Sequence, residues 1–208
     1  MAQQRKRILL VGAAGVVGRC VHAQLKDEHD IITAGLAGAD LVFDLTDTAA
    51  VVRVLNDIGP LDAVISTAGR ASFVRLDAVQ PNALADSPYG LGLTDKLLGQ
   101  VNLALAARAV LRPGGSITLT SGTTSDDPII GGSSLSMVNG ALERWVRAAA
   151  TELPQGLRLN VVSPSLVEGT PPQAMAAFPG IEAVSAHRVG LAYLRCLASG
   201  ITGQVIRV

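Results

Sequence analysis

Short apolar runs alternate along the chain with longer stretches in which apolar residues recur every three or four positions. The short runs are rich in β-branched side chains and are bounded by Gly, Pro or Asp, which is typical of buried strands. We therefore predict strands at 7–11, 30–34, 41–43, 61–66, 115–120, 157–162 and 203–208.

The longer stretches predict amphipathic helices between those strands. In the segment 135–149, apolar residues at three- and four-residue spacing form one stripe along a helical face. Pro113 and Pro154, each followed closely by glycine, stop the helices that precede them. The predicted helices cover 15–27, 47–58, 91–111, 134–152 and 182–198.

Strands that alternate with helices predict an α/β fold. The expected architecture is a Rossmann-like, doubly wound parallel sheet of about seven strands with helices on both faces. The chain has 208 residues and shows no linker, internal repeat or low-complexity tract, which favours a single domain over 1–208. Hydrophobic residues make up 49% of the chain but aromatic residues only 3%, so we expect a core of Ala, Val, Leu and Ile.

Charge and cysteine content narrow the class of protein. Lys plus Arg and Asp plus Glu both number 17, so net charge gives no argument for nucleic-acid or membrane binding. No apolar run approaches the roughly 18 residues of a membrane span, and the N-terminus lacks a signal-peptide pattern. Cys20 and Cys196 are interpreted as two reduced core thiols, which favours a cytoplasmic protein. His22, His29 and His187 show no ligand spacing, so no metal site is expected.

A glycine-rich motif, "VGAAGVVGR", directly follows the first predicted strand and opens the first predicted helix. Its glycines are Gly12, Gly15 and Gly18. Glycine at such a turn lets the backbone approach a pyrophosphate, which then sits at the positive N-terminus of the helix. The motif therefore predicts nucleotide binding; the alternative is a tight strand–helix turn without a ligand.

This glycine spacing, together with later motifs, resembles the short-chain dehydrogenase/reductase family over nearly the whole chain. "FDLTD" at 43–47 resembles the family's adenine-contacting pair, and "STAG" at 66–69 resembles its Asn-Asn-Ala-Gly turn. "LNVVSPSLVEGT" resembles the strand and loop that hold the nicotinamide amide, with Ser165 in place of the usual Gly and Thr170 one residue late. The resemblance implies that the cofactor is bound by Gly12, Ala14, Gly15, Val16, Val17, Gly18, Asp44, Leu45, Ala68, Gly69, Pro164 and Val167.

The choice between NAD and NADP stays open. An acid at the end of the second strand would bond the ribose hydroxyls of NAD, whereas an Arg would hold the extra phosphate of NADP. Here that position offers Gly35 and Leu36, neither acid nor base. Arg19, just after the glycine loop, could reach a 2′-phosphate or could be a solvated helix residue.

The resemblance also implies a set of catalytic residues, which is incomplete in this sequence. In the family a tyrosine donates the proton, a lysine lowers the pKa of that tyrosine, a serine polarises the substrate oxygen, and an Asn holds a relay water. Ser121 and Asn102 match the serine and the Asn. "SSLSMVNGALERW" at 133–145 opens the helix that should carry the other two, but places Leu135 at the tyrosine position and Asn139 at the lysine position. Asn139 could still bond the nicotinamide ribose.

Other groups are weighed as a relocated proton donor. Tyr89 in a Pro/Gly-rich loop could overhang the site, although a packing role is favoured. Lys96 precedes Asn102 by six residues on one predicted helix, roughly 240° around it, so it is expected at the surface. Tyr193 has aliphatic neighbours and is expected in the core. Asp126 and Asp127 are expected to serve a turn or a cap.

The expected function is that of an NAD(P)-dependent oxidoreductase of the short-chain type with an atypical active site. It would transfer a hydride between the cofactor and a small carbonyl or alcohol substrate. The alternatives are an inactive NAD(P)-binding sensor or regulatory protein, and a non-redox isomerase or lyase. The segment at about 164–182 occupies the family's substrate-lid position. The family's habit of pairing through two helices, here 91–111 and 134–152, implies a homodimer or homotetramer.

Overall fold

The seven predicted strands form one parallel sheet in the computed structural model, which describes residues 5–208. Their order across the sheet is β3-β2-β1-β4-β5-β6-β7. The strands are β1 (Arg7–Val11), β2 (Asp30–Gly35), β3 (Leu41–Val42), β4 (Leu61–Ser66), β5 (Leu111–Thr120), β6 (Arg158–Ser163) and β7 (Val205–Arg207).

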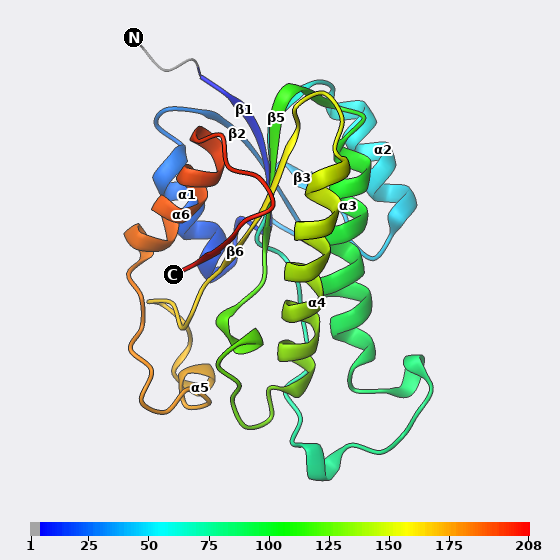
Figure 1. The fold of residues 1–208 in the computed structure, drawn as a ribbon, viewed down its shortest axis with the longest axis vertical. Helices are drawn as coiled ribbons and strands as arrows, with labels where there is room; N and C mark the ends of the chain where they lie inside the picture. Colours follow the sequence, from blue (N-terminus) through cyan, green and yellow to red (C-terminus); the bar gives the residue numbers. More distant parts are fainter. Residues whose placement is uncertain (1–4) are drawn as a thin grey trace.

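Helices cover both faces of the sheet, as Figure 1 shows edge-on. On one face lie α1 (Val16–Leu25) and α6 (Ala186–Ala198); on the other lie α2 (Thr48–Ile58), α3 (Gln100–Ala107) and α4 (Ser133–Ala149). The alternation within β1 explains this: Ile8 and Leu10 pack with the α1 and α6 side, while Leu9 and Val11 pack with the other. The doubly wound Rossmann-type fold is confirmed.

The long helix predicted at 91–111 differs from the observed structure. It begins as a π-helical segment, η3 (Gly92–Gly99), continues as α3, and ends at Ala107 because Leu111 already belongs to β5. Glycines bound η3 where neighbours are close: a Cβ on Gly92 would lie 3.1 Å from Ser134 Oγ, and one on Gly99 would lie 3.0 Å from Leu45 Cβ. The π-helical turn places the side chains of this segment differently from a regular helix.

The segment 182–198 also begins later than predicted, at Ala186. The Ser185 side chain caps α6, its hydroxyl accepting a hydrogen bond from the Arg188 backbone N–H at 3.3 Å. A short helix, α5 (Pro172–Met175), lies in the predicted lid segment and was not predicted.

Strand order reverses at β1, which is hydrogen-bonded to β2 on one side and to β4 on the other. Val11 at the end of β1 is in register with both Ala34 of β2 and Ser66 of β4. The connection after β1 runs to β2 on one side, and the connection after β4 runs to β5 on the other side. The two connections therefore diverge and leave a crevice beyond the carboxyl ends of β1 and β4. In open α/β sheets this crevice is where ligands bind.

Within residues 5–208, no helix has both the length and the apolar character to cross a membrane. The same residues contain no group of three or more His, Cys, Asp or Glu placed to hold a metal ion. Cys20 and Cys196 are both free and buried, and burial raises the pKa of each thiol.

Candidate functional site

The glycine motif forms a tight loop between β1 and α1. Gly12 has a positive φ of 86°, and a Cβ there would lie 2.7 Å from the Ala68 backbone N. The Thr67 hydroxyl donates to the carbonyl oxygens of Val11 and Gly12, each at 3.0 Å, which fixes the loop to the end of β4. α1 then begins with no side-chain cap and no acid in its first turn. Its N-terminal N–H groups therefore offer a site for an anion such as a pyrophosphate.

A first cavity of about 560 Å³ lies over this loop and the ends of β2 and β4. Seven of the residues expected to bind the cofactor line it: Gly12, Ala14, Gly15, Asp44, Leu45, Ala68 and Gly69. Gly18 does not, because it packs beneath the loop, where a Cβ would lie 2.8 Å from the Ala13 Cα. The cavity suits the adenosine and pyrophosphate portion of a dinucleotide.

Asp44 and Leu45 sit at the rim of this first cavity. Asp44 Oδ1 accepts from the backbone N–H and the hydroxyl of Thr46, both at 2.8 Å. The backbone hydrogen bond from Thr46, then the one from its hydroxyl, lowers the pKa of Asp44 below its usual value. Asp44 therefore remains an ionised hydrogen-bond acceptor near neutral pH.

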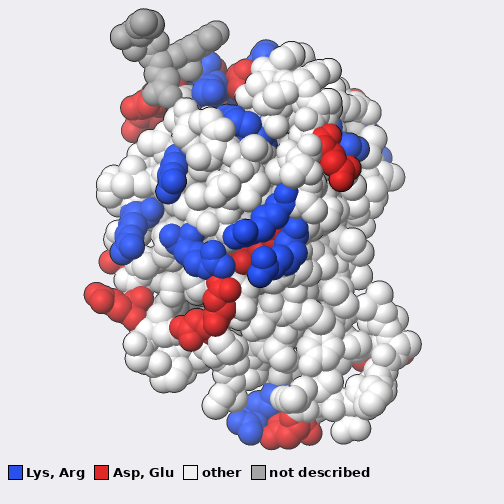
Figure 2. All heavy atoms as spheres, viewed as in Figure 1, with Lys and Arg blue, Asp and Glu red and all other residues white. Residues whose placement is uncertain are grey.

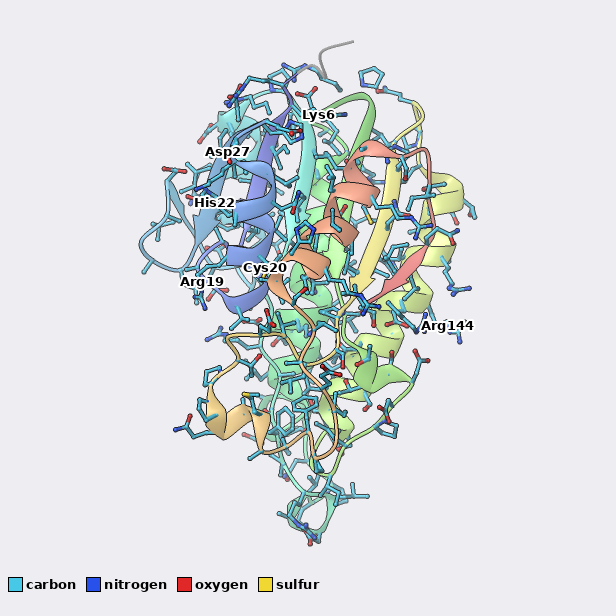
Figure 3. The ribbon with its side chains drawn as sticks, turned by 90° about the vertical axis from the view of Figure 1, so that its left-hand side faces the viewer. Lys6, Arg19, Cys20, His22, Asp27 and Arg144 are labelled. Atoms are coloured by element: carbon cyan, nitrogen blue, oxygen red, sulfur yellow. The ribbon has the colours of Figure 1, made fainter. Side chains whose placement is uncertain are left out.

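The end of β2 carries no charged side chain that would distinguish the ribose hydroxyls of NAD from the 2′-phosphate of NADP. Leu36 follows β2 and is 56% exposed. Arg19 lies at the glycine-loop end of α1, with His22 one turn further along (Figure 3). The Arg19 guanidinium donates to the Ala14 carbonyl at 2.5 Å, so this side chain folds back onto the loop.

A second cavity, of about 200 Å³, lies over the ends of β5 and β6. Val16, Val17, Pro164 and Val167, the remaining expected cofactor residues apart from Gly18, all line it. So do three expected catalytic-site positions, Ser121, Leu135 and Asn139, together with Lys96, Gly122, Thr123, Thr124, Ser165, Leu166, Thr170 and Phe178. The structure thus brings both halves of the expected site to the same edge of the sheet.

Ser121 is hydrogen-bonded, on the side away from the cavity, to the buried Glu143, a residue that the sequence motifs did not single out. Its hydroxyl donates to Glu143 Oε1 at 2.8 Å. The same oxygen accepts from the hydroxyls of Ser125, at 3.0 Å, and Ser163, at 2.9 Å, while Arg207 donates to Oε2 at 3.4 Å. The hydroxyl proton of Ser121 is therefore already used, and does not point to a substrate oxygen as the family comparison implied.

Asn139 and Leu135 lie one turn apart on α4, facing the second cavity. Asn139 is 2% exposed, and its Nδ2 donates to Thr124 Oγ1 at 2.9 Å. Its Oδ1 is buried and has no hydrogen-bond partner among residues 5–208. Because this acceptor lies beside a cavity, a hydroxyl or amide N–H of a bound ligand could donate the missing hydrogen bond to it.

Asn102 does not reach this cavity. Its amide nitrogen lies 3.4 Å from Thr48 Oγ1, at the start of α2. The expectation of a catalytic-site Asn at 102 is therefore not supported by the geometry, because this face of α3 turns toward α2. The sequence predicts Asn102 at the site and Lys96 at the surface, whereas in the structure Lys96 and not Asn102 lines the second cavity.

Lys96 faces the cavity instead, contrary to the surface position expected for it. The residue is half-buried on η3, and its Nζ donates to the backbone carbonyl of Ser121 at 3.2 Å. Desolvation lowers the pKa of Lys96 to about 8, although the neighbouring negative charge of Asp95 opposes this. Asp95 is itself bound by Arg70, whose Nη2 lies 2.7 Å from Asp95 Oδ2.

The two tyrosines weighed as proton donors lie outside the second cavity. Tyr89 Oη is 3.1 Å from Ser133 Oγ at the start of α4. Tyr193 is fully buried in α6, as expected, with its hydroxyl 2.6 Å from Thr120 Oγ1. Burial raises the pKa of Tyr193 well above its usual value, so it holds its proton.

The segment 164–182 forms a loop closed at its base. The Val184 N–H donates to the Leu166 carbonyl at 2.8 Å, and the Glu168 N–H donates to the Val184 carbonyl at 2.9 Å. Phe178 lines the second cavity and meets Phe73 edge-on, with ring centroids 6.5 Å apart. The loop therefore covers one side of the cavity, and its role as a substrate lid stays a prediction.

The sheet order, the glycine loop and the two cavities define a dinucleotide-binding α/β protein. A family model described as enoyl-(acyl carrier protein) reductase matches residues 13–194. The protein lin1944 from Listeria innocua is 34% identical with a TM-score of 0.92, over 97% of this chain and 98% of that one. The chain belongs to the short-chain dehydrogenase/reductase family.

Two further relatives carry a functional description. A small-chain dehydrogenase whose structure was solved in complex with NADPH is 25% identical, with a TM-score of 0.84, over 98% of this chain and 96% of that one. L-xylulose reductase from Mus musculus is 26% identical over 166 residues. That match covers 78% of this chain and 66% of the mouse protein, slightly less than two thirds of its length.

Proposed function

We propose that the protein is an NAD(P)-dependent oxidoreductase that interconverts a small carbonyl compound and its alcohol. The observation that carries this is that the two cavities are neighbours, because consecutive residues line one and then the other. Gly15 lines the first and Val16 the second; Asp95 lines the first and Lys96 the second. A dinucleotide that lay along the carboxyl ends of the strands would pass from one cavity into the other.

The residues present fit that cofactor. Gly12 and Gly15 line the first cavity at the start of α1, where a pyrophosphate would bind, and Asp44 offers an acceptor to the adenine. Val16, Val17 and the loop 164–167 would hold the nicotinamide end, where Asn139 Oδ1 lacks a partner. When bound, the nicotinamide supplies or accepts a hydride. We also propose a cytoplasmic location, in line with two free buried thiols.

The second cavity favours a small substrate. Its volume of about 200 Å³ is modest, and Leu135, Leu166 and Phe178 give it apolar walls. The NADPH-bound dehydrogenase and the mouse reductase among the relatives belong to the reaction class proposed here.

Separate titrations with NADH and NADPH, followed by a carbonyl panel read as loss of reduced-nicotinamide absorbance, test the proposal. We expect binding of at least one cofactor and turnover of at least one small ketone or aldehyde. Binding without turnover on a broad panel would instead support a cofactor-binding regulatory protein. Leu135 at the tyrosine position, which has no proton to donate, is the observation that favours this second function.

The uncharged end of β2 allows a test of cofactor placement. Leu36→Asp puts a carboxylate where it would accept from the ribose hydroxyls of NAD and repel the 2′-phosphate of NADP. We expect the ratio of the NADPH to the NADH dissociation constant to rise by about tenfold or more. Leu36→Asn, of similar shape but uncharged, should leave the ratio nearly unchanged. An equal effect of both variants would place the adenosine ribose elsewhere.

Self-association is also proposed, through α3, η3 and α4. Leu98, Leu105 and Met137 on these elements are 48%, 42% and 41% exposed, and Figure 2 shows a largely uncharged surface over the lower half of α4. We expect sedimentation to give a dimer or tetramer, and Leu105→Glu to weaken it by about tenfold or more. Leu191→Glu, equally exposed on α6 at the other face of the sheet, is the matched control. A monomeric wild-type protein would refute the proposal.

A further inference from the structure

The second cavity lacks the family's tyrosine but contains one group that can release a proton. Lys96 is the only ionisable side chain among the residues that line it. We propose that Lys96 is the catalytic acid, delivering from its ammonium group the proton that the substrate oxygen takes up during carbonyl reduction. This inference rests on the proposed function.

The other polar groups of the cavity do not serve as acids. Serine and threonine hydroxyls hold their protons far above neutral pH, and the Ser121 proton is already donated to Glu143. Leu135 has no proton to give, and the Asn139 amide does not ionise. Tyr89 and Tyr193 do not line the cavity. A proton donor at this site must therefore be Lys96 or a water molecule.

The backbone around Lys96 is shaped to admit its side chain. Gly69 has a φ of 144°, and a Cβ there would lie 2.7 Å from Lys96 Cγ, so only glycine leaves this passage open. The π-helical geometry of η3 turns Lys96 toward the end of β5. Nζ donates one hydrogen bond, to the Ser121 carbonyl at 3.2 Å. Of its three N–H donors, two remain for a ligand in the cavity.

The charges around Lys96 suit an acid that works near neutral pH. Desolvation lowers its pKa to about 8, and Asp95, the adjacent negative charge, is compensated by Arg70. From α4, Glu143 faces the other side of Ser121, and Arg207 of β7 is its ionic partner at 3.4 Å. Lys96 is thus mostly protonated at pH 7. Its ammonium group releases a proton more readily than that of an exposed lysine, because its pKa is lower.

The proton step balances without a further reactant. In reduction, the carbonyl carbon gains a C–H bond from the hydride, and the electron pair of the C=O π bond moves to the oxygen. That oxygen takes a proton from Lys96 Nζ, the N–H bond breaks, and the neutral amine regains a proton from water. In oxidation, the neutral amine accepts the alcohol proton.

Two Lys96 variants separate proton donation from charge. Lys96→Met removes the acid, and we expect kcat for reduction to fall by about 10²–10⁴-fold. Lys96→Arg keeps the charge but holds its protons at any working pH, so it should not restore the rate. Lys26→Met, at an exposed position after α1, is the control and should match the wild type.

The pH dependence of kcat/KM distinguishes a proton donor from a lysine with a purely structural role, because only loss of the donor changes this dependence. Wild-type kcat/KM for reduction should fall as pH rises through about 8, because the ammonium is lost, and the oxidation rate should rise there. Both transitions should be absent in Lys96→Met. Turnover of Lys96→Met with an unchanged profile would overturn the inference and leave the proposed function standing.

Titration of Lys96 itself needs neither cofactor nor turnover. The sequence contains three lysines, Lys6, Lys26 and Lys96, so ¹³Cε-lysine NMR gives few signals. We expect one signal, missing in Lys96→Met, to titrate near pH 8 in the cofactor-free protein. An ordinary pKa of roughly 10.4 for that signal would overturn the inference. If the wild type binds cofactor but reduces no carbonyl, the proposed function fails and the catalytic role of Lys96 fails with it; a pKa of about 10.4 in an enzyme that does reduce carbonyls overturns the inference alone.

Discussion

Replacing Glu143 with alanine is expected to lower the free energy of unfolding by about 2–5 kcal/mol. Glu143 is 5% exposed, and its Oε1 accepts hydroxyls from Ser121, Ser125 and Ser163 at 2.8, 3.0 and 2.9 Å. Alanine would leave the buried hydroxyls of Ser121 and Ser163 without this acceptor, while the partly exposed Arg207 keeps its ion pair with Asp126. Each buried polar group left unpaired costs about 1–3 kcal/mol, and partial relaxation keeps the total below the sum.

Urea denaturation of Glu143→Ala, Glu143→Gln and Glu152→Ala measures this loss. Glutamine keeps an oxygen that can accept from the serines, so its loss should be clearly smaller than that of alanine and measurable even if the alanine variant does not fold. Glu152 is exposed, and its replacement should change stability by about 0.5 kcal/mol or less. A Glu143→Ala variant within about 1 kcal/mol of wild type would show that the cluster does not stabilise the fold.

The position of Glu143 also explains why the catalytic end differs from the family pattern. Its side chain joins the end of β5 at Ser121 to the end of β6 at Ser163, and it accepts from Arg207 of β7. This network fixes the floor of the second cavity from α4. It also directs the Ser121 proton away from the cavity, so the side chain that contacts Ser121 from the cavity lining is that of Lys96, on η3.

The fold could be predicted because its signals are local. Strand β1 is the continuous apolar run Ile8–Val11, and such a run, with alternate residues buried on opposite faces, is typical of a sheet covered on both faces. The π-helical segment could not be predicted in the same way. It depends on contacts that are distant in sequence, such as Gly99 against Leu45. Apolar periodicity therefore extended a regular helix through 91–111.

The cofactor end and the catalytic end of the site also differ in how far the sequence alone reveals them. The cofactor end relies on backbone geometry, and Gly12 and Gly15 reveal it in the sequence as glycines at fixed spacing. The catalytic end depends on which side of a helix faces the cavity. Choosing Asn102 as the inward residue turned Lys96 outward, and only the packing of η3 against α4 and β5 resolves that choice. A useful signal was available: Lys96 is one of three lysines and stands in the apolar segment "GLTDKLLG".

Gly18→Ala is expected to disrupt the nucleotide loop. A Cβ at Gly18 would lie 2.8 Å from both the Ala13 Cα and the Gly12 carbonyl carbon, and closer still to the Gly12 carbonyl oxygen. These are backbone atoms, so α1 must move away from the loop. We expect a loss of about 1–3 kcal/mol in unfolding free energy, as for an overpacked core. Cofactor affinity should fall by about tenfold or more, because the N–H groups at the start of α1 move with the helix.

The same substitution at Gly140 provides the control, with the opposite sign expected. Gly140 lies in the interior of α4, and a Cβ there would meet nothing within 4 Å. Alanine should therefore stabilise the protein by about 0.5–1 kcal/mol, since it restricts the unfolded chain and favours the helix. Thermal melts and cofactor titrations of both variants measure the contrast. If Gly18→Ala bound the cofactor as tightly as Gly140→Ala, close packing of the glycine loop against α1 would not be what forms the anion site.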